Sequence, residues 1–261
     1  MVDPAAVADA GTRVFAELSR RVPGFDGLVE PDVTVACVDL PIARVNSASA
    51  AHFEPGTADT RIDDVVAWFE RRGVPFVWRL GPCDEPADLQ SRLLAKGFAL
   101  DPDEMPGMAA PLTDLPEVEL PDGVSIEVVR DATAFREWLD VMVAGFGMAP
   151  EIGDAYAAFG TLGFGDDVPV RSLLVRVGDR PAAIALGAFA DRGLVIANVT
   201  TLPDERGRGL GRAVTLATMR IGAAAGAEIA VLQSTEMGHS IYRRLGFEEF
   251  GMYRVLAKLP G

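Results

Sequence analysis

The chain has 261 residues, a length that fits one or two domains, and 49% of them are apolar and 24% charged, as in a globular protein with a buried core. It carries 24 Lys and Arg against 38 Asp and Glu, which gives a net charge of −14. Most of this negative charge lies in residues 1–120, which hold 21 acidic and 10 basic side chains. Surfaces that bind nucleic acid or anionic lipid need a positive field, so we expect neither as a partner.

The first elements predicted along the chain follow an acidic N-terminus, Met1-Val2-Asp3-Pro4, which lacks the basic head and apolar run of a secretory signal. An Ala-rich helix comes next. Helical spacing then predicts helices over residues 62–72 and 87–96, with a strand at 75–80 between them. No run approaches the roughly 18 consecutive apolar residues of a membrane span. We therefore expect a cytoplasmic protein.

Cysteine and histidine are scarce. Cys37 and Cys83 lie far apart, outside any C-x-x-C pattern, and the two histidines, His52 and His239, are equally scattered. Such a set lacks the spacing of zinc ligands, and lone cysteines in a cytoplasmic protein are usually buried, reduced thiols. We expect no metal.

Residues 112–124 contain two prolines and four acidic residues and show no helical periodicity. They predict a linker at 113–122 that divides the chain into domains at 1–112 and 123–261. The second half alternates strands and helices, which predicts a mixed α/β (α+β) fold with a mixed sheet flanked by helices. In chain order these elements are a strand at 124–129, helices at 132–146 and 150–162, strands at 172–177, 182–189 and 194–201, a helix ending near 225, a strand at 228–233, a helix at 236–245 and a final strand or hairpin at 247–259.

The two halves end alike. The helix at 87–96 leads into Gly97-Phe98, and the helix at 236–245 leads into Gly246-Phe247. Aligning these pairs places Leu93 where the second half has Tyr242. With halves of similar size and shared element order, this match predicts a tandem duplication.

The most informative segment, residues 200–212, joins a strand to an amphipathic helix through three glycines and three arginines. Glycines let a ligand approach the main chain, and the first N–H groups of a helix form an anion site. Arg206, Arg208 and Arg212 add positive charge suited to phosphate. The alternative is a structural turn with solvated arginines. The glycine spacing fits neither the dinucleotide-binding fingerprint nor the P-loop, and leaves the pattern R-x-x-G-x-G at Arg206, Gly209 and Gly211.

This pattern, followed after a helix and a strand by Tyr242-Arg243-Arg244-Leu245-Gly246-Phe247, resembles the GNAT superfamily of acyl-CoA-dependent N-acetyltransferases. The resemblance covers residues 123–259. It implies two GNAT-like domains in tandem with a strongly twisted mixed sheet, as in members of the mycothiol synthase type. The first copy is degenerate, because no R-x-x-G-x-G precedes Ile62.

The resemblance also implies roles for particular residues. The cofactor is acetyl-CoA, whose pantetheine arm would follow the strand at Val199, Thr200 and Thr201. Tyr242 would act as the general acid that protonates the leaving thiolate. The phosphates would lie on the turn formed by Arg206, Gly207, Arg208, Gly209, Leu210, Gly211 and Arg212.

The chain departs from the family pattern in two ways. Many members carry Asn and Ala seven and four residues before the tyrosine, where this chain has Thr235 and Gly238. Many also place a glutamate on the strand before the glycine turn as the base, whereas residues 194–201 contain no acidic residue.

The resulting hypothesis is transfer of an acetyl group from acetyl-CoA to a primary amine of a small molecule or peptide by a monomer or homodimer. An acidic exterior favours cationic acceptors. The alternatives are a non-catalytic acyl-CoA-binding module and a structural protein whose glycine turn binds nothing. Binding of CoA separates the last from the other two, and release of free thiol with an amine separates the first two.

Overall fold

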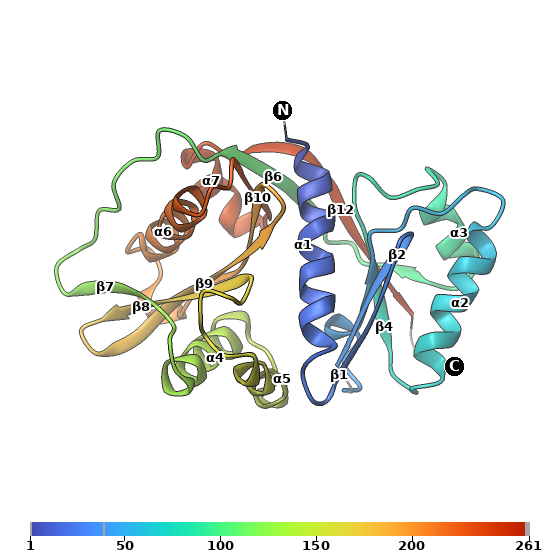
Figure 1. Cartoon of the computed structure of the whole chain (residues 1–261), viewed down its shortest axis with the longest axis horizontal. Coiled ribbons are helices and arrows are strands. Elements are labelled where there is room, and N and C mark those ends of the chain that lie inside the picture. Colours follow the sequence, from blue (N-terminus) through green and yellow to red (C-terminus); the bar gives the residue numbers. More distant parts are fainter. Residues whose placement is uncertain (1, 39, 259–261) are drawn as a thin grey trace. The chain divides into compact units, whose positions relative to one another are not determined.

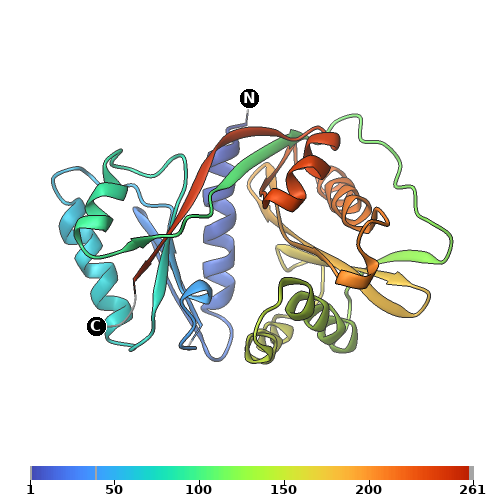
Figure 2. The ribbon, with the colours of Figure 1, turned by 180° about the vertical axis from the view of Figure 1, so that it is seen from behind.

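The computed structural model describes residues 2–38 and 40–258, and the chain forms two compact units (Figures 1 and 2). Unit 1 comprises Met1–Gly11 and Met108–Glu249, and unit 2 comprises Thr12–Gly107 and Phe250–Gly261. Helix α1 (Pro4–Ser19) and strands β6 (Met105–Pro111) and β12 (Glu248–Lys258) each contribute residues to both units. Each unit is therefore built from two separate segments of the sequence.

Unit 1 is built on a sheet in the order β6-β11-β10-β9-β8-β7. Strands β7 (Val124–Val128), β8 (Val170–Val177), β9 (Arg180–Ala190) and β10 (Gly193–Thr201) pair antiparallel, and β11 (Ile229–Gln233) pairs parallel with β10. Residues 182–185 of β9 are all buried, so both faces of the sheet are covered.

Helices lie on both faces of this sheet. In the two opposite views, α6 (Leu210–Ala224) and α7 (Glu236–Arg244) lie on one face, and α4 (Ala132–Phe146) and α5 (Pro150–Tyr156) on the other (Figures 1 and 2). Short 3₁₀ turns follow α5 (η2, Ala157–Leu162) and β10 (η3, Pro203–Glu205).

Unit 2 repeats part of this plan with shorter elements. Its sheet has the order β1-β2-β3-β4-β12, in which β3 (Ser47–Ser49) and β4 (Phe76–Leu80) pair parallel and the other neighbours antiparallel. Its remaining elements are β1 (Phe25–Glu30), β2 (Val33–Val38), η1 (Ala43–Val45), α2 (Ala58–Glu70), α3 (Leu89–Ala95) and β5 (Ala99–Leu100), which pairs with β12.

The core of unit 2 is aromatic. Phe69 of α2 stacks on Phe76 of β4 with ring centroids 4.0 Å apart, and Phe98 packs edge-on against Phe76 and Trp78. Leu93 of α3 is fully buried in the same cluster. The helices of unit 2 are thus fixed to its sheet by burial of large apolar side chains.

The predicted mixed α/β class is confirmed, and each element expected in the second half is present. The helix expected at 150–162 is wrong in part, since it changes from α5 to the 3₁₀ turn η2 after Tyr156. The final strand ends at Lys258, and Leu259 lies outside the described residues. In the first half the prediction missed β1, β2, β3, β5 and β6.

Candidate functional site

Strands β10 and β11 separate after a short parallel contact. They pair only at Gly193, Leu194 and Val195, opposite Ile229, Ala230 and Val231. Beyond Val195, β10 stays paired with β9 through a bulge between Ala197 and Thr200, where Asn198 takes a φ of 52°. The edge of β10 that faces β11 therefore has no strand partner at Val199, Thr200 and Thr201, the three residues predicted to hold the pantetheine arm.

A glycine turn leads from this edge into α6. Gly207 and Gly209 have φ values of 79° and 78°, in the left-handed region that favours glycine, and Gly209 is the N-cap of α6. Apart from the glycine itself and its two chain neighbours, no atom of residues 2–38 and 40–258 lies within 4 Å of the position a Cβ would take at either residue. A Cβ on Gly211 would meet only the Thr201 hydroxyl oxygen, at 3.6 Å. The turn thus leaves open space in front of the first, unpaired N–H groups of a 15-residue helix.

The three arginines of the turn differ in their partners. Arg206 donates to the carbonyl oxygens of Thr201 (3.2 Å) and Gly145 (3.1 Å), so it ties the end of β10 to α4. Arg208 forms an ion pair with Glu205. Arg212 is exposed and makes no hydrogen bond or ion pair within residues 2–38 and 40–258. Within the described chain, no carboxylate pairs with Arg206 or Arg212, and of these two Arg212 also lacks a hydrogen bond.

Glu205 is a buried carboxylate that the sequence analysis did not single out. It is 5% exposed and pairs with Arg180, at 2.6 Å, as well as with Arg208. The spacing of Glu205 and Arg208, three residues apart, was the one local signal for this pair. Because a buried carboxylate needs such partners, Arg208 has a structural role in the turn.

Tyr242 lies on α7 and is 8% exposed. Its ring packs against Phe247, with centroids 5.9 Å apart, and belongs to the cluster that includes Leu216 and Met219. Burial raises the pKa of Tyr242 to about 12, so the phenol stays protonated at neutral pH. Its hydroxyl makes no hydrogen bond to the described part of the chain. Tyr242 is thus a proton donor without a protein acceptor.

Several further polar and aromatic side chains of unit 1 have structural partners. Trp138 is buried and donates to the Ala185 carbonyl at 3.2 Å, which makes it a core residue. Asp154 pairs with Arg136 at 2.8 Å, and His239 contacts Glu249 at 2.7 Å. Among the described residues no group of three or more His, Cys, Asp or Glu could hold a metal ion, and no helix there is long and apolar enough to cross a membrane.

The parallel strands of unit 2, β3 and β4, do not separate in this way. After β3 and β4 pair, residues 51–53 continue to pair with residues 84–85, with a parallel bridge between His52 and Glu85. Glu85 N donates to Ala51 O at 2.8 Å, and Phe53 N donates to Glu85 O at 3.2 Å. The Asp84 carboxylate accepts from the N–H groups of Ala51 and Gly81, both at 2.8 Å. In unit 2 the segment at 81–85 therefore pairs with the chain beyond β3. In unit 1 no such segment fills the space between β10 and β11 within the described residues.

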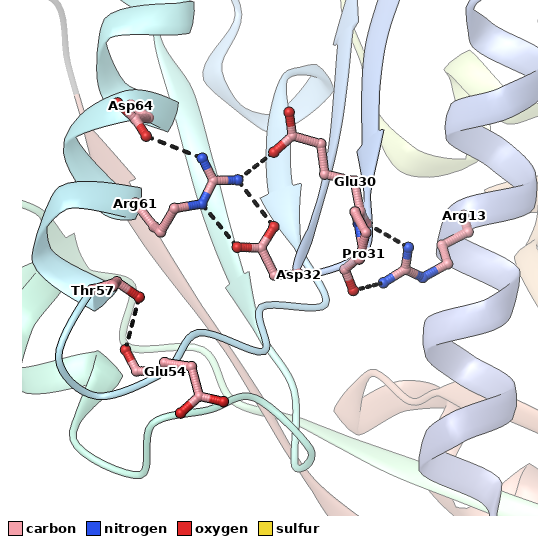
Figure 3. A network of polar contacts seen from close by, with 8 residues as sticks. All are labelled: Arg13, Glu30, Pro31, Asp32, Glu54, Thr57, Arg61 and Asp64. Carbon is pink, nitrogen blue, oxygen red and sulfur yellow. Dashed lines mark hydrogen bonds and ion pairs between the residues drawn. The ribbon is translucent and has the colours of Figure 1, made fainter.

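The start of α2 also differs from the start of α6. The connection from β3 to α2, residues 50–57, is shorter than residues 196–209 of unit 1 and carries no arginine. The nearest arginine in sequence, Arg61, pairs with Glu30, Asp32 and Asp64 (Figure 3). Its hydrogen bond lowers the pKa of Asp32, so that carboxylate stays charged and holds the guanidinium. This helix start offers no free arginine comparable to Arg212.

No family model matches the sequence, and the curated proteins include no match. Solved structures do match over nearly the whole chain. A GCN5-related N-acetyltransferase from Kribbella flavida is 24% identical with a TM-score of 0.72, covering 97% of this chain and 96% of its own. A second GCN5-related N-acetyltransferase, from Sphaerobacter thermophilus, is 18% identical with a TM-score of 0.64, covering 98% of this chain and 94% of its own.

A tandem GNAT protein from the clavulanic acid biosynthesis pathway is 13% identical, with a TM-score of 0.60, covering 95% of this chain and 88% of its own. Identities this low establish the fold alone. The open strand edge, the glycine turn and these likenesses together give the chain the fold of the GNAT N-acetyltransferases.

Proposed function

We propose that the protein transfers an acetyl group from acetyl-CoA to a primary amine, using one site in residues 123–261. The observation that carries the proposal is the unpaired edge of β10, which leads directly into the glycine turn and the start of α6. An extended ligand with amide groups next to a pyrophosphate suits these two features, since the strand edge binds amides and the helix start binds anions.

The residues of this site match the steps of acyl transfer. The acceptor amine attacks the thioester carbonyl, and a new C–N bond forms as the oxygen takes up negative charge. A main-chain N–H near Val199 stabilises that oxyanion. The carbonyl then re-forms as the C–S bond breaks, and the Tyr242 hydroxyl gives its proton to the departing thiolate. The amine loses its extra proton to solvent, and the Tyr242 phenolate takes up a proton from solvent.

The proposal assigns no acyl-CoA site to unit 2. Residues 81–85 occupy the place beside β3 that stays open beside β10, and the start of α2 carries no arginine turn. We propose that residues 1–112 are a degenerate copy whose cleft has closed. The acceptor is proposed to be a small cationic amine or a peptide, in keeping with the net charge of −14.

The test combines titration calorimetry with CoA and a panel of amines assayed for release of free thiol from acetyl-CoA. Wild type and Tyr242→Phe are compared with each active acceptor. The Phe variant keeps the ring and removes the proton donor, so kcat should fall about 10²–10⁴-fold with little change in the Kd for CoA.

Each outcome separates two hypotheses. A Phe variant within about threefold of wild type contradicts the role of Tyr242, because general acid catalysis contributes far more than that. CoA binding without thiol release over the whole panel indicates the alternative, a non-catalytic acyl-CoA-binding module. Absence of CoA binding overturns the proposal.

A further inference from the structure

Thr201, the last residue of β10, turns its main-chain N–H and carbonyl away from β9. Leu202 N donates to Ala182 O at 2.9 Å, so residue 202 faces β9, and consecutive residues of an antiparallel strand face opposite edges. Thr201 therefore faces the edge that β11 leaves unpaired. Its carbonyl oxygen already has a partner, because Arg206 Nε donates to it at 3.2 Å.

The same guanidinium binds the end of α4. Arg206 Nη2 donates to Gly145 O at 3.1 Å. Gly145 lies in the last turn of α4, where carbonyls lack a partner within the helix and the helix dipole favours a cation. The backbone of α4 also lies close to β10 there, since a Cβ added at Gly145 would be 2.5 Å from the Thr200 hydroxyl oxygen. Arg206 thus holds the start of the glycine turn to both β10 and α4.

Arg206 and Arg212 stand on either side of the glycines and differ in what their N–H groups bind. Arg206 uses two of them on main-chain carbonyls, whereas Arg212 makes no hydrogen bond or ion pair within residues 2–38 and 40–258. An anion could bind Arg212 without breaking any contact in the described chain. Recruiting the same two N–H groups of Arg206 would break its links to β10 and α4.

We infer that Arg206 is a positioning residue, which holds the unpaired edge of β10 and the glycine turn at the spacing that lets one CoA molecule bind both. This inference rests on the proposed function. The bond to Thr201 O joins the edge to the turn, and the bond to Gly145 O fixes this junction on α4. A ligand that binds two places at once gains affinity when their spacing is fixed in advance.

The first test compares CoA with ADP, which carries the pyrophosphate and lacks the pantetheine arm. In Arg206→Ala the Kd for CoA should rise about tenfold, while the Kd for ADP should change by less than about twofold, because ADP does not use the strand edge. Arg212→Ala is the matched control. It removes a cation of the turn itself and should raise both Kd values by the same factor. Calorimetry measures CoA binding, and an NMR titration measures the weaker binding of ADP.

The second test separates the hydrogen bonds of Arg206 from its charge. In Arg206→Gln the amide nitrogen takes the place of Nε in the side chain, so it can still donate to Thr201 O although the charge is lost. This variant should bind CoA within about threefold of wild type. Arg212→Gln should bind CoA as weakly as Arg212→Ala, because its role depends on charge.

The outcomes distinguish the inference from the proposed function. Equal losses for CoA and ADP in Arg206→Ala with an unchanged Tm, or no gain in CoA affinity from Ala to Gln at this position, show that Arg206 binds phosphate directly and overturn its positioning role. Wild-type CoA affinity in Arg206→Ala overturns it too. If Arg206→Ala lowers the Tm and loses both ligands, the comparison of Arg206→Gln with Arg212→Gln decides. Wild type that fails to bind CoA overturns the proposed function itself.

Discussion

At the scale of single residues, the turn before α6 contains two kinds of glycine. Gly207 and Gly209 are required by their positive φ values, whereas Gly211 has a helical backbone and free space around it. The first two are needed to form the turn. The third is free to vary unless a ligand lies in front of it, so Gly211 separates binding from folding.

Replacing Gly211 by leucine should abolish CoA binding and leave the Tm close to that of wild type. Leucine favours a helix, and the nearest atom to a Cβ there is 3.6 Å away, so the free protein accommodates it. Calorimetry with CoA and thermal unfolding check this. The matched control is Gly56→Leu, in the corresponding connection of unit 2, where space is also open and CoA affinity should not change. Wild-type affinity in the Gly211 variant contradicts the assignment of the phosphate turn.

The different partners of the arginines in the turn lead to a second prediction at this scale. Arg212 has no partner among the described residues, so Arg212→Ala should weaken CoA binding by about 1–3 kcal/mol, as for a charge-assisted hydrogen bond. Arg208 already pairs with Glu205, and Arg208→Ala should cost less. Titration of both variants decides the order, and a larger loss with Arg208→Ala shows that Arg208 leaves Glu205 for the phosphate.

At the scale of elements, the contrast between the two parallel strand pairs is the main finding. Strands β10 and β11 separate after Val195, but in unit 2 the pairing extends past the ends of β3 and β4 because Asp84 and Glu85 bind main-chain groups of residues 51–53. The Asp84 carboxylate accepts from the N–H groups of Ala51 and Gly81 and so joins the chain just beyond the ends of β3 and β4.

Asp84→Ala removes the acceptor for two N–H groups at once, so we expect it to lower the free energy of unfolding by about 1–3 kcal/mol. Urea denaturation measures this loss. CoA affinity should stay at the wild-type value, because the change lies outside residues 123–261. Wild-type stability indicates that the segment at 81–85 is held by other contacts.

Long, periodic elements were predictable from sequence, and short ones were not. Helix α4 has the predicted bounds because Asp131 caps its start and Gly147, at φ 63°, ends it. Strand β3 has three residues, and β6 contains Pro106 and Gly107, so neither shows an alternating pattern.

The predicted site shows the same division. A glycine turn joins β10 to α6 at the residues that the pattern indicated, and the roles of those residues stay predictions. The closure by Asp84 and the burial of Glu205 depend on hydrogen bonds and ion pairs between segments distant in sequence, such as Asp84 with Ala51 and Glu205 with Arg180. No local pattern encodes these pairs.

At the scale of the whole molecule, one strand pair that separates and one that stays paired predict a single bound CoA per chain. Calorimetry with CoA should give a stoichiometry of one, because the helix start in unit 2 lacks the arginine turn and its strands stay paired. A stoichiometry of two, with equal affinities, contradicts the closure of unit 2.

The make-up of unit 2 from two segments that lie far apart in the sequence has a consequence for biosynthesis. Residues Arg254–Lys258 of β12 pair with β4, and the ribosome translates β4 long before it reaches them. While the ribosome is still translating the second half, β4 lacks this partner, and an unpaired strand edge invites association with other chains. The sheet of unit 2 gains this strand only after residues 254–258 have left the exit tunnel, so the edge of β4 stays without it while the intervening residues are translated.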